Sequence, residues 1–133
     1  MTLCPCDSGK AYNQCCEIYH LGKPAPTAEA LMRSRYCAYA LVGTNAALED
    51  YLRHTWHPDT RPQQLNLTGE EAIKWLGLQV KSHQSIDDNH AMVTFVARYK
   101  YANNLSGKAE RLQETSRFNR IKNQWYYIDG VHQ

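Results

Sequence analysis

The 133-residue sequence lacks a long apolar run, and no stretch approaches the roughly 20 residues that a membrane-spanning helix needs. It also lacks a charged and then apolar leader, because Met1, Thr2 and Leu3 lead directly into Cys4. A disorder signature is missing too, since 43% of the residues are apolar and 21% are charged. We therefore expect a soluble, cytoplasmic protein made of one ordinary domain with room for one small appendage.

A strong imbalance of charge is also missing. Lys and Arg number 15 and Asp and Glu number 13, which gives a formal charge of +2 with every cysteine counted as neutral. Four cysteine thiolates holding one Zn²⁺ would cancel this excess. Nucleic acid binding depends on a clear surplus of basic side chains. We therefore expect no nucleic acid partner.

Four of the five cysteines lie close together near the amino terminus. Cys4 and Cys6 flank one proline, eight residues follow, and Cys15 and Cys16 are adjacent. Four sulfurs in so short a loop can close a tetrahedral zinc–thiolate site of the structural kind. The segment has no hydrophobic core of its own, so metal binding would have to supply its folding free energy. We predict one Zn²⁺ on Cys4, Cys6, Cys15 and Cys16, with iron as a minor alternative.

Disulfides are the competing interpretation of these cysteines. A bridge between the adjacent Cys15 and Cys16 would be strained, and bridges across the loop would suit a secreted protein better. The spacing favours the metal site. If the metal site forms, its four sulfurs should lie within about 4 Å of one another. Cys37 stands apart, and we expect it to be buried against the sheet as a small, unreactive hydrophobe.

The cysteine segment resembles the SEC-C motif, the zinc knuckle at the carboxyl end of the SecA translocation ATPase. Besides the cysteines, the match includes Ser8-Gly9-Lys10, Tyr12 and Gln14. Cys16 occupies the fourth-ligand position, which is His in many copies, and Asp7 stands where the motif often has Gly. The SecA knuckle resembles a docking site for the SecB export chaperone. The resemblance therefore implies a protein partner.

Helix signals come first in the remainder of the chain. Thr27 predicts the N-cap of a helix over residues 28–42 that stops at Gly43, and a second helix is predicted over residues 45–55. A capping box of Thr68 and Glu71 predicts a short third helix that ends at Gly77. Residues 17–26 contain one glycine and two prolines and are predicted to be an irregular connector.

Strand signals follow, with alternating hydrophobicity. Strands are predicted over residues 78–83, 91–101, 111–121 and 124–129, with a hairpin turn at Lys122-Asn123. Helices followed by antiparallel strands predict an α+β domain with the helices packed on one face of the sheet. The order of elements favours a cone-shaped, cystatin-like sheet curled around a long helix.

Nearly the whole chain resembles the YchJ family, in which a SEC-C knuckle precedes a nuclear-transport-factor-like cone domain. The matching segments are residues 32–38, 55–58, 75–78, 95–99, 116–118 and 125–130. The resemblance implies a knuckle over residues 1–22 and a cone over residues 23–133. Many YchJ-like proteins carry a second knuckle after the Asp-Gly stretch; this chain ends at Gln133 without one, so we expect no function that needs two.

The resemblance also points to polar residues of the cone, which form either a pocket or an ion-pair cluster. These candidates are Arg33, Arg35, Tyr36, His57, Arg98, Glu114 and Arg117. We favour an ion-pair network that ties helix to sheet, in which Glu114 contacts at least one of the arginines. A lone His57 before Pro58 is expected to form hydrogen bonds at a helix end rather than to act as a base.

The sequence shows neither the spacing of a metalloenzyme site nor a Ser-His-Asp order, so we favour a role other than catalysis. The leading hypothesis is a zinc-binding interaction module whose knuckle docks on a protein while the cone supports it or forms a homodimer. The alternative is a small-molecule site in the cone, for binding or for an enzymatic reaction. We also expect the two units to fold separately, so that Cys6→Ser melts the knuckle alone.

Overall fold

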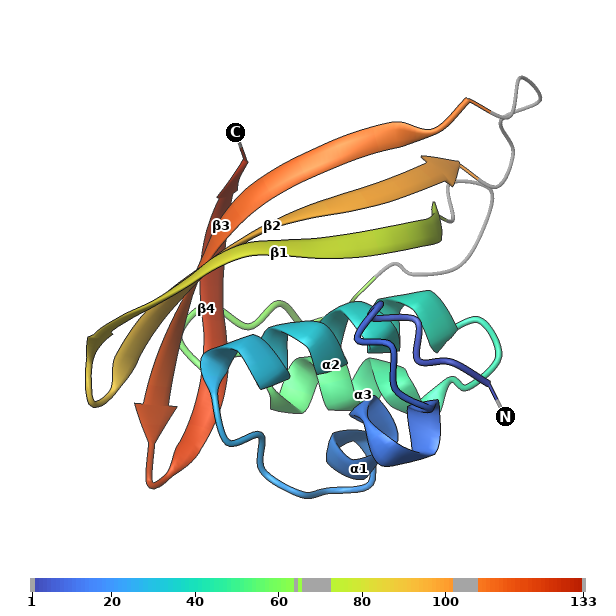
Figure 1. Cartoon of the computed structure of the whole chain (residues 1–133). Helices are drawn as coiled ribbons and strands as arrows, with labels where there is room; N and C mark the ends of the chain where they lie inside the picture. Colours follow the sequence, from blue (N-terminus) through green and yellow to red (C-terminus); the bar gives the residue numbers. More distant parts are fainter. Residues whose placement is uncertain (1, 64, 66–72, 102–107, 133) are drawn as a thin grey trace.

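The computed structural model describes residues 2–63, 65, 73–101 and 108–132. Its helical half contains a 3-10 turn at Tyr12–Gln14, then α1 (Cys16–His20), α2 (Ala28–Leu41) and α3 (Ala47–His54). Its strands are β1 (Ile73–Asp87), β2 (His90–Tyr101), β3 (Glu110–Ile121) and β4 (Gln124–His132). The helices lie on one side of the curved sheet (Figure 1), so the predicted α+β class is confirmed. In this described part, no helix has the length and apolar character for a membrane crossing.

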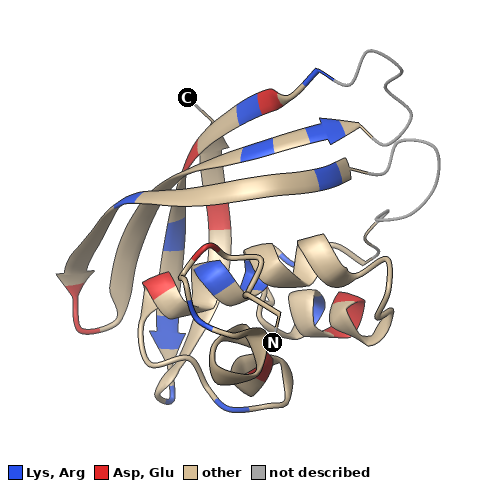
Figure 2. Ribbon diagram, turned by 45° about the vertical axis from the view of Figure 1, so that its right-hand side comes forward, with Lys and Arg blue, Asp and Glu red and all other residues tan. Residues whose placement is uncertain are grey.

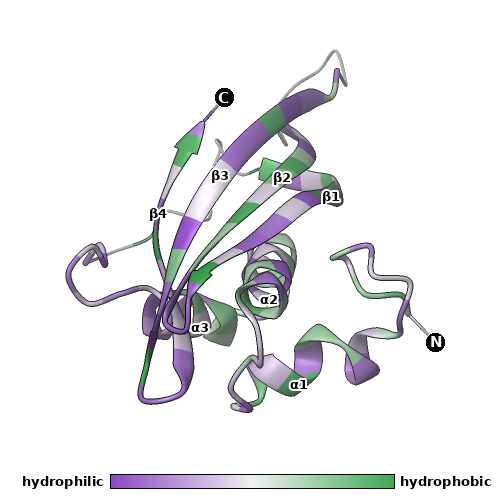
Figure 3. Cartoon of the chain, turned by 60° about the vertical axis from the view of Figure 1, so that its left-hand side comes forward, coloured by the Kyte–Doolittle hydropathy of each residue, from purple (hydrophilic) through white to green (hydrophobic). Residues whose placement is uncertain are grey.

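The four strands form one antiparallel sheet in the order β1-β2-β3-β4. Register shifts interrupt the β1–β2 pairing at three places and the β3–β4 pairing at one. Such irregularities bend a strand and increase its twist, which allows the sheet to curl over α2 (Figure 3). The curled sheet around a long helix confirms the predicted cone shape. Basic and acidic residues are interspersed along both layers in the view of Figure 2.

The inward face of β2 builds much of the core beneath this sheet. Ala91, Val93, Phe95 and Ala97 are all buried, as strict alternation predicts. Helix α2 lies across this face and contributes Leu31, Met32 and Tyr36 to the same core. Burial of apolar area at this contact is the main source of stability for the cone.

The long helix begins where the sequence predicts. The Thr27 hydroxyl accepts a hydrogen bond from the backbone N–H of Ala30 at 3.0 Å, which satisfies one of the free donors of the first turn. The helix ends at Leu41, one residue before the predicted end. The hairpin at Lys122-Asn123 is also confirmed, since both residues have a positive φ, 51° and 67°.

Two local predictions are wrong. Ile73 to Gly77 belong to β1 and not to a short helix, because Ile73 and Trp75 pair with Tyr101 and Tyr99 of β2. Apolar residues at these positions also fit a period of two, and cross-strand pairing outweighs the local helix signal. The capping residues Thr68 and Glu71 lie outside the described residues. The predicted connector contains α1, which ends before Gly22.

The knuckle, here residues 2–22, packs against the cone. Cys4, Cys6 and Cys16 are buried in the same core cluster as α2 and the sheet. Nη1 of Arg33 donates to the carbonyl of Cys6 at 2.8 Å. Nε2 of His20 donates to the carbonyl of Ser34 at 2.8 Å. The boundary between residues 22 and 23 stays a prediction, but the shared core favours cooperative folding over two separate units.

Hydrogen bonds also join each edge strand of the sheet to the helical half. On β1, the backbone N–H of Leu78 donates to Oδ2 of Asp7 at 2.9 Å. On β4, the N–H of Tyr127 donates to the carbonyl of Thr55 at 2.8 Å, and the N–H of His57 donates to the carbonyl of Tyr127 at 2.7 Å. Segments far apart in the sequence therefore hold both edges of the sheet in place.

Asp7→Ala tests the tie to β1. The change removes the acceptor of the Leu78 N–H and places alanine at a φ of 61°, which asparagine and aspartate tolerate better. We expect the free energy of unfolding to fall by about 1–3 kcal/mol in urea titrations. Asp7→Asn keeps an acceptor oxygen and should stay near the parent. Equal stability of the two variants would contradict this role for the carboxylate.

Candidate metal centre and cone cavity

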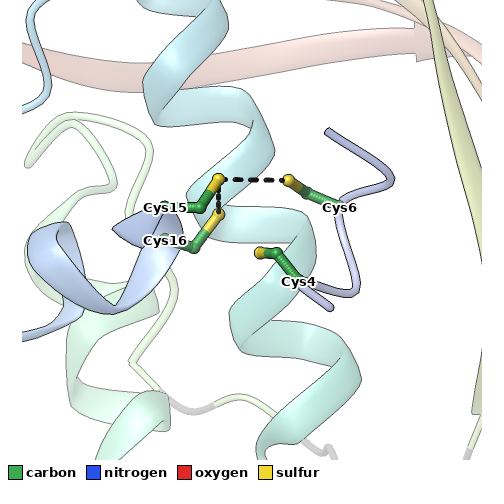
Figure 4. A group of neighbouring side chains, drawn as sticks. All are labelled: Cys4, Cys6, Cys15 and Cys16. Atoms are coloured by element: carbon green, nitrogen blue, oxygen red, sulfur yellow. Dashed lines mark hydrogen bonds between the residues drawn. The ribbon is translucent and has the colours of Figure 1, made fainter. Parts of the chain in front are cut away.

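Four thiols converge beside α2. The sulfurs of Cys4, Cys6, Cys15 and Cys16 all lie within 4.8 Å of one another, and they point toward a common centre (Figure 4). The distance from Cys6 to Cys15 is 3.7 Å and that from Cys15 to Cys16 is 3.9 Å. Tetrahedral zinc–sulfur bonds of about 2.3 Å place sulfurs about 3.8 Å apart. The 4.8 Å limit on the sulfur–sulfur distances exceeds the predicted 4 Å, but the cluster is compatible with one bound metal.

A tight reversal brings the two cysteine pairs together. The N–H of Cys4 donates to the carbonyl of Lys10 at 2.8 Å, and the N–H of Asp7 donates to the carbonyl of Cys4 at 3.2 Å. Asp7 and Gly9 close this turn with φ values of 61° and 84°. The first of these explains the Gly often found at the Asp7 position, because glycine adopts a positive φ at no steric cost.

The donor set suits a structural metal. All five cysteines are free thiols, so no disulfide competes for them. Cys4, Cys6 and Cys16 are buried, and Cys15 is partly exposed. Four sulfur donors leave no position of a tetrahedral ion open for a substrate. The arrangement can therefore hold a metal but offers no open site for catalysis.

The fifth cysteine lies next to this cluster. Cys37 is fully buried, as predicted, in the core cluster that α2 shares with the sheet, and its sulfur also lies 3.7 Å from that of Cys4 in the knuckle. Its hydrogen bond with Cys16 lowers the pKa of Cys37, but the contact with Cys4 and burial outweigh this effect and raise it overall. Cys37 remains a neutral thiol, and its S–H can donate to Cys4.

The structure separates the seven polar candidates of the cone. Arg35, Tyr36 and Glu114 line one cavity of about 190 Å³ between α2 and the sheet. Arg33 faces the knuckle and pairs with Glu29 of its own helix at 3.0 Å. Arg98 is exposed on the outer face of β2. The link between helix and sheet runs from Arg33 through Glu29 to His83 of β1, with Oε1 of Glu29 4.0 Å from Nδ1 of His83, and it does not include Glu114.

The other two candidates lie outside the cavity as well. Arg117 makes a two-pronged ion pair with Asp129 across the surface of β3 and β4, at 2.7 and 2.6 Å. His57 follows α3, and its Nδ1 accepts a hydrogen bond from the N–H of Asp59 at 3.0 Å. This bond belongs to the turn that follows α3 and does not reach the helix, so the helix-end role of His57 stays a prediction.

Glu114 does not contact an arginine, contrary to the prediction. Its Oε1 pairs with Nε2 of His132 at 2.9 Å, and its Oε2 accepts from the Ser116 hydroxyl at 2.6 Å. The register explains the partner, because Glu114 lies opposite His132. Arg117 is three residues along the same strand and so lies on the opposite face.

Several cavity residues were missed in the sequence. Met32 and Tyr39 line the cavity from α2 on either side of the predicted Tyr36, and Tyr127 lines it from β4. The helical residues are spaced by four and three, so they share one face. That shared helix face could have been predicted from the spacing in the sequence. The contribution of Tyr127 could not, because it depends on the curl of the sheet.

Comparison with known proteins identifies both parts of the chain. Residues 27–130 match the family described as YchJ, middle NTF2-like domain, and residues 2–18 match the SEC-C motif. A UPF0225 protein of Bordetella pertussis is 49% identical over 130 residues, covering 96% of this chain and 90% of the relative. A UPF0225 protein of Chromobacterium violaceum is 51% identical over 134 residues, covering 96% and 91%.

Two solved structures share the fold. The solution structure of a SEC-C motif containing protein from Rhodopseudomonas palustris has a TM-score of 0.76 and 32% identity, with 96% of each chain covered. The crystal structure of a SEC-C motif containing protein from Psychrobacter arcticus has a TM-score of 0.73 and 28% identity, covering 98% of this chain and 82% of the other. These neighbours confirm the cone with its amino-terminal cysteine segment.

Cys37→Ala tests whether the fifth cysteine is a ligand. We expect one metal ion per chain to be retained, because the four clustered cysteines remain, and stability to fall by about 1 kcal/mol. Elemental analysis and urea unfolding measure the two effects. Cys16→Ala is the matched comparison and should lose the metal. Loss of metal from Cys37→Ala would make Cys37 a ligand.

Gly130→Ala tests the position of Glu114. A Cβ at residue 130 would overlap the Glu114 carboxylate, so the variant should expel that side chain from its contact with Ser116. We expect a loss of about 1–3 kcal/mol in the free energy of unfolding. Gly43→Ala is the control, since a Cβ there meets no atom within 4 Å. In a Glu114→Ala background, Gly130→Ala should lose most of its effect on the free energy of unfolding. A loss of stability that persists in this background would contradict the explanation.

Proposed function

The chain belongs to the YchJ-like family, and from that premise we propose that it is a zinc-binding interaction protein of the cytoplasm. The knuckle holds one Zn²⁺ through Cys4, Cys6, Cys15 and Cys16, and it docks on a protein partner. The observation that carries the proposal is the convergence of four free thiols within 4.8 Å. Free thiols are typical of a reducing compartment such as the cytoplasm.

Zinc is the ion that this donor set favours. Four thiolates without an imidazole or carboxylate suit a soft or borderline ion in tetrahedral geometry. The bound ion would fix the knuckle against α2, because the Cys4 and Cys6 loop and the start of α1 would share one centre. Its role is structural: it supplies folding free energy to a segment that is otherwise short of apolar contacts.

The outer surface of the knuckle is available for a partner. Its inner side contacts α2 and β1 through Cys37, Arg33 and Leu78. Leu3 and Leu21 are 66% and 81% exposed, and burial of these side chains under a partner would remove apolar surface from water. We assign these two side chains to the docking surface, and an apolar segment of another protein is the partner that suits them.

Removal of zinc should destabilise the whole chain. We expect one zinc per chain by elemental analysis, and a fall in the melting temperature of at least about 10 °C on chelation, because three of the clustered cysteines belong to the shared core. Cys6→Ser should behave like the chelated protein. A metal-free protein with an unchanged melting curve would contradict the proposal.

Cross-linking in cells tests the docking surface. Leu3→Ser with Leu21→Ser should abolish a specific cross-linked partner while zinc content stays at one per chain. Ile86→Ser is the matched control, since Ile86 is 54% exposed at the far end of β1. A cross-link that survives the double substitution would rule out this surface. A cross-link between two copies of the chain would identify a homodimer instead.

A further inference from the structure

The cavity between α2 and the sheet has an aromatic wall. Tyr36, Trp75, Phe95, Phe118 and Tyr127 all line it. Its volume of about 190 Å³ is slightly larger than the roughly 150 Å³ of an engineered apolar cavity that binds benzene. The cavity therefore has room for one six-membered ring with a small substituent.

Two charged side chains, Arg35 and Glu114, line this largely apolar space. Arg35 is only 5% exposed, and its Nη1 donates to the Leu52 carbonyl at 2.7 Å and to the Thr55 hydroxyl at 2.6 Å. Its guanidinium carbon also lies over the rings of Tyr127 and Trp56, at 4.6 and 5.1 Å. All of these groups are uncharged. They orient the guanidinium but do not neutralise it.

Among the described residues no carboxylate lies within ion-pair distance of Arg35, although the charge of Glu114 acts on it across the cavity. Burial lowers the pKa of its guanidinium, yet an arginine remains protonated at neutral pH. Tyr39, which faces the same cavity, also interacts with Arg35, and burial raises the pKa of this phenol, so Tyr39 adds no negative charge. Buried cations are ordinarily paired with an anion, because desolvation of a lone charge is costly.

Glu114 is the acidic residue in the lining of the same cavity, and its side chain is 12% exposed. Both of its oxygens are already engaged, one by His132 and the other by Ser116. It makes no ion pair with Arg35. The cavity thus presents a buried guanidinium, an aromatic wall, and a carboxylate that is hydrogen-bonded to Ser116 and His132.

We propose that the cavity binds a small organic acid, with its ring-sized apolar body against the aromatic wall and its carboxylate on Arg35. A planar carboxylate matches the guanidinium fork and would bring a negative charge into direct contact with Arg35, which Glu114 does not. A cation in the same position would meet Arg35 with like charge. This binding needs neither the docking surface nor a partner protein, and so it is independent of the function proposed above.

Titration of the full-length, zinc-loaded protein with benzoate tests the proposal. Benzyl alcohol has the same ring and no charge, and it serves as the uncharged probe. Amide chemical shifts should move saturably around Arg35, Tyr36 and Tyr127, with benzoate binding at least about tenfold more tightly than benzyl alcohol. Equal affinities, or no saturable response to benzoate, would overturn the proposal.

Two variants separate binding from folding. Arg35→Lys keeps the charge but loses the planar fork, and it should weaken benzoate by about tenfold or more. Because Arg35 also supports the end of α3, a second variant, Ala97→Val, fills the cavity from β2 and leaves the bonds of Arg35 in place. It should weaken benzoate by at least about tenfold without lowering the melting temperature.

Arg117→Met is the matched control. It removes a surface arginine that pairs with Asp129 and does not line the cavity. Benzoate affinity should stay within about twofold of the parent. An unchanged affinity in Ala97→Val, or an equal loss in Arg117→Met, would place any benzoate outside the cavity and refute the assignment.

Discussion

Helix α2 is buried from two sides, and the rest of the structure depends on this constraint. One side carries Arg33, Ser34 and Cys37 against the knuckle. The other carries Met32 and Tyr36 against the sheet. The helix has 14 residues, so these two sets of contacts lie close together along it. The thiol cluster and the cavity therefore share α2 as a common wall.

Local signals were enough to predict much of the fold. The Thr27 cap, the alternation of β2 and the Lys122-Asn123 turn are each encoded within a few neighbouring residues, and each was correct. Residues 73–77 were misread because their strand depends on pairing with β2, some 25 residues away. A helix signal read over ten residues carries no information about such a partner.

The thiol cluster and the cavity also differ in how far the local sequence predicts them. The thiol cluster was predictable because all four cysteines lie within 13 residues and a single turn joins them. The cavity was only partly predictable, since its walls come from α2 and all four strands. Arg35, Tyr36 and Glu114 were expected, but their arrangement depends on register, which pairs Glu114 with His132 instead of an arginine. The burial of Cys37 was predicted correctly, but its contact with Cys4 was not, because that contact depends on how the knuckle packs on α2.

The ties at Asp7 and at Tyr127 have a consequence for association between molecules. An open four-stranded sheet has two edge strands whose unpaired backbone groups can recruit a strand from another chain. Here the N–H of Leu78 on β1 donates to the Asp7 carboxylate. On β4, the backbone N–H and carbonyl of Tyr127 bond to the backbone of Thr55 and His57. At these positions both edges are covered by the chain itself. The amino-terminal knuckle and the segment after α3 thereby interrupt each edge, which shortens the stretch that another strand could pair with.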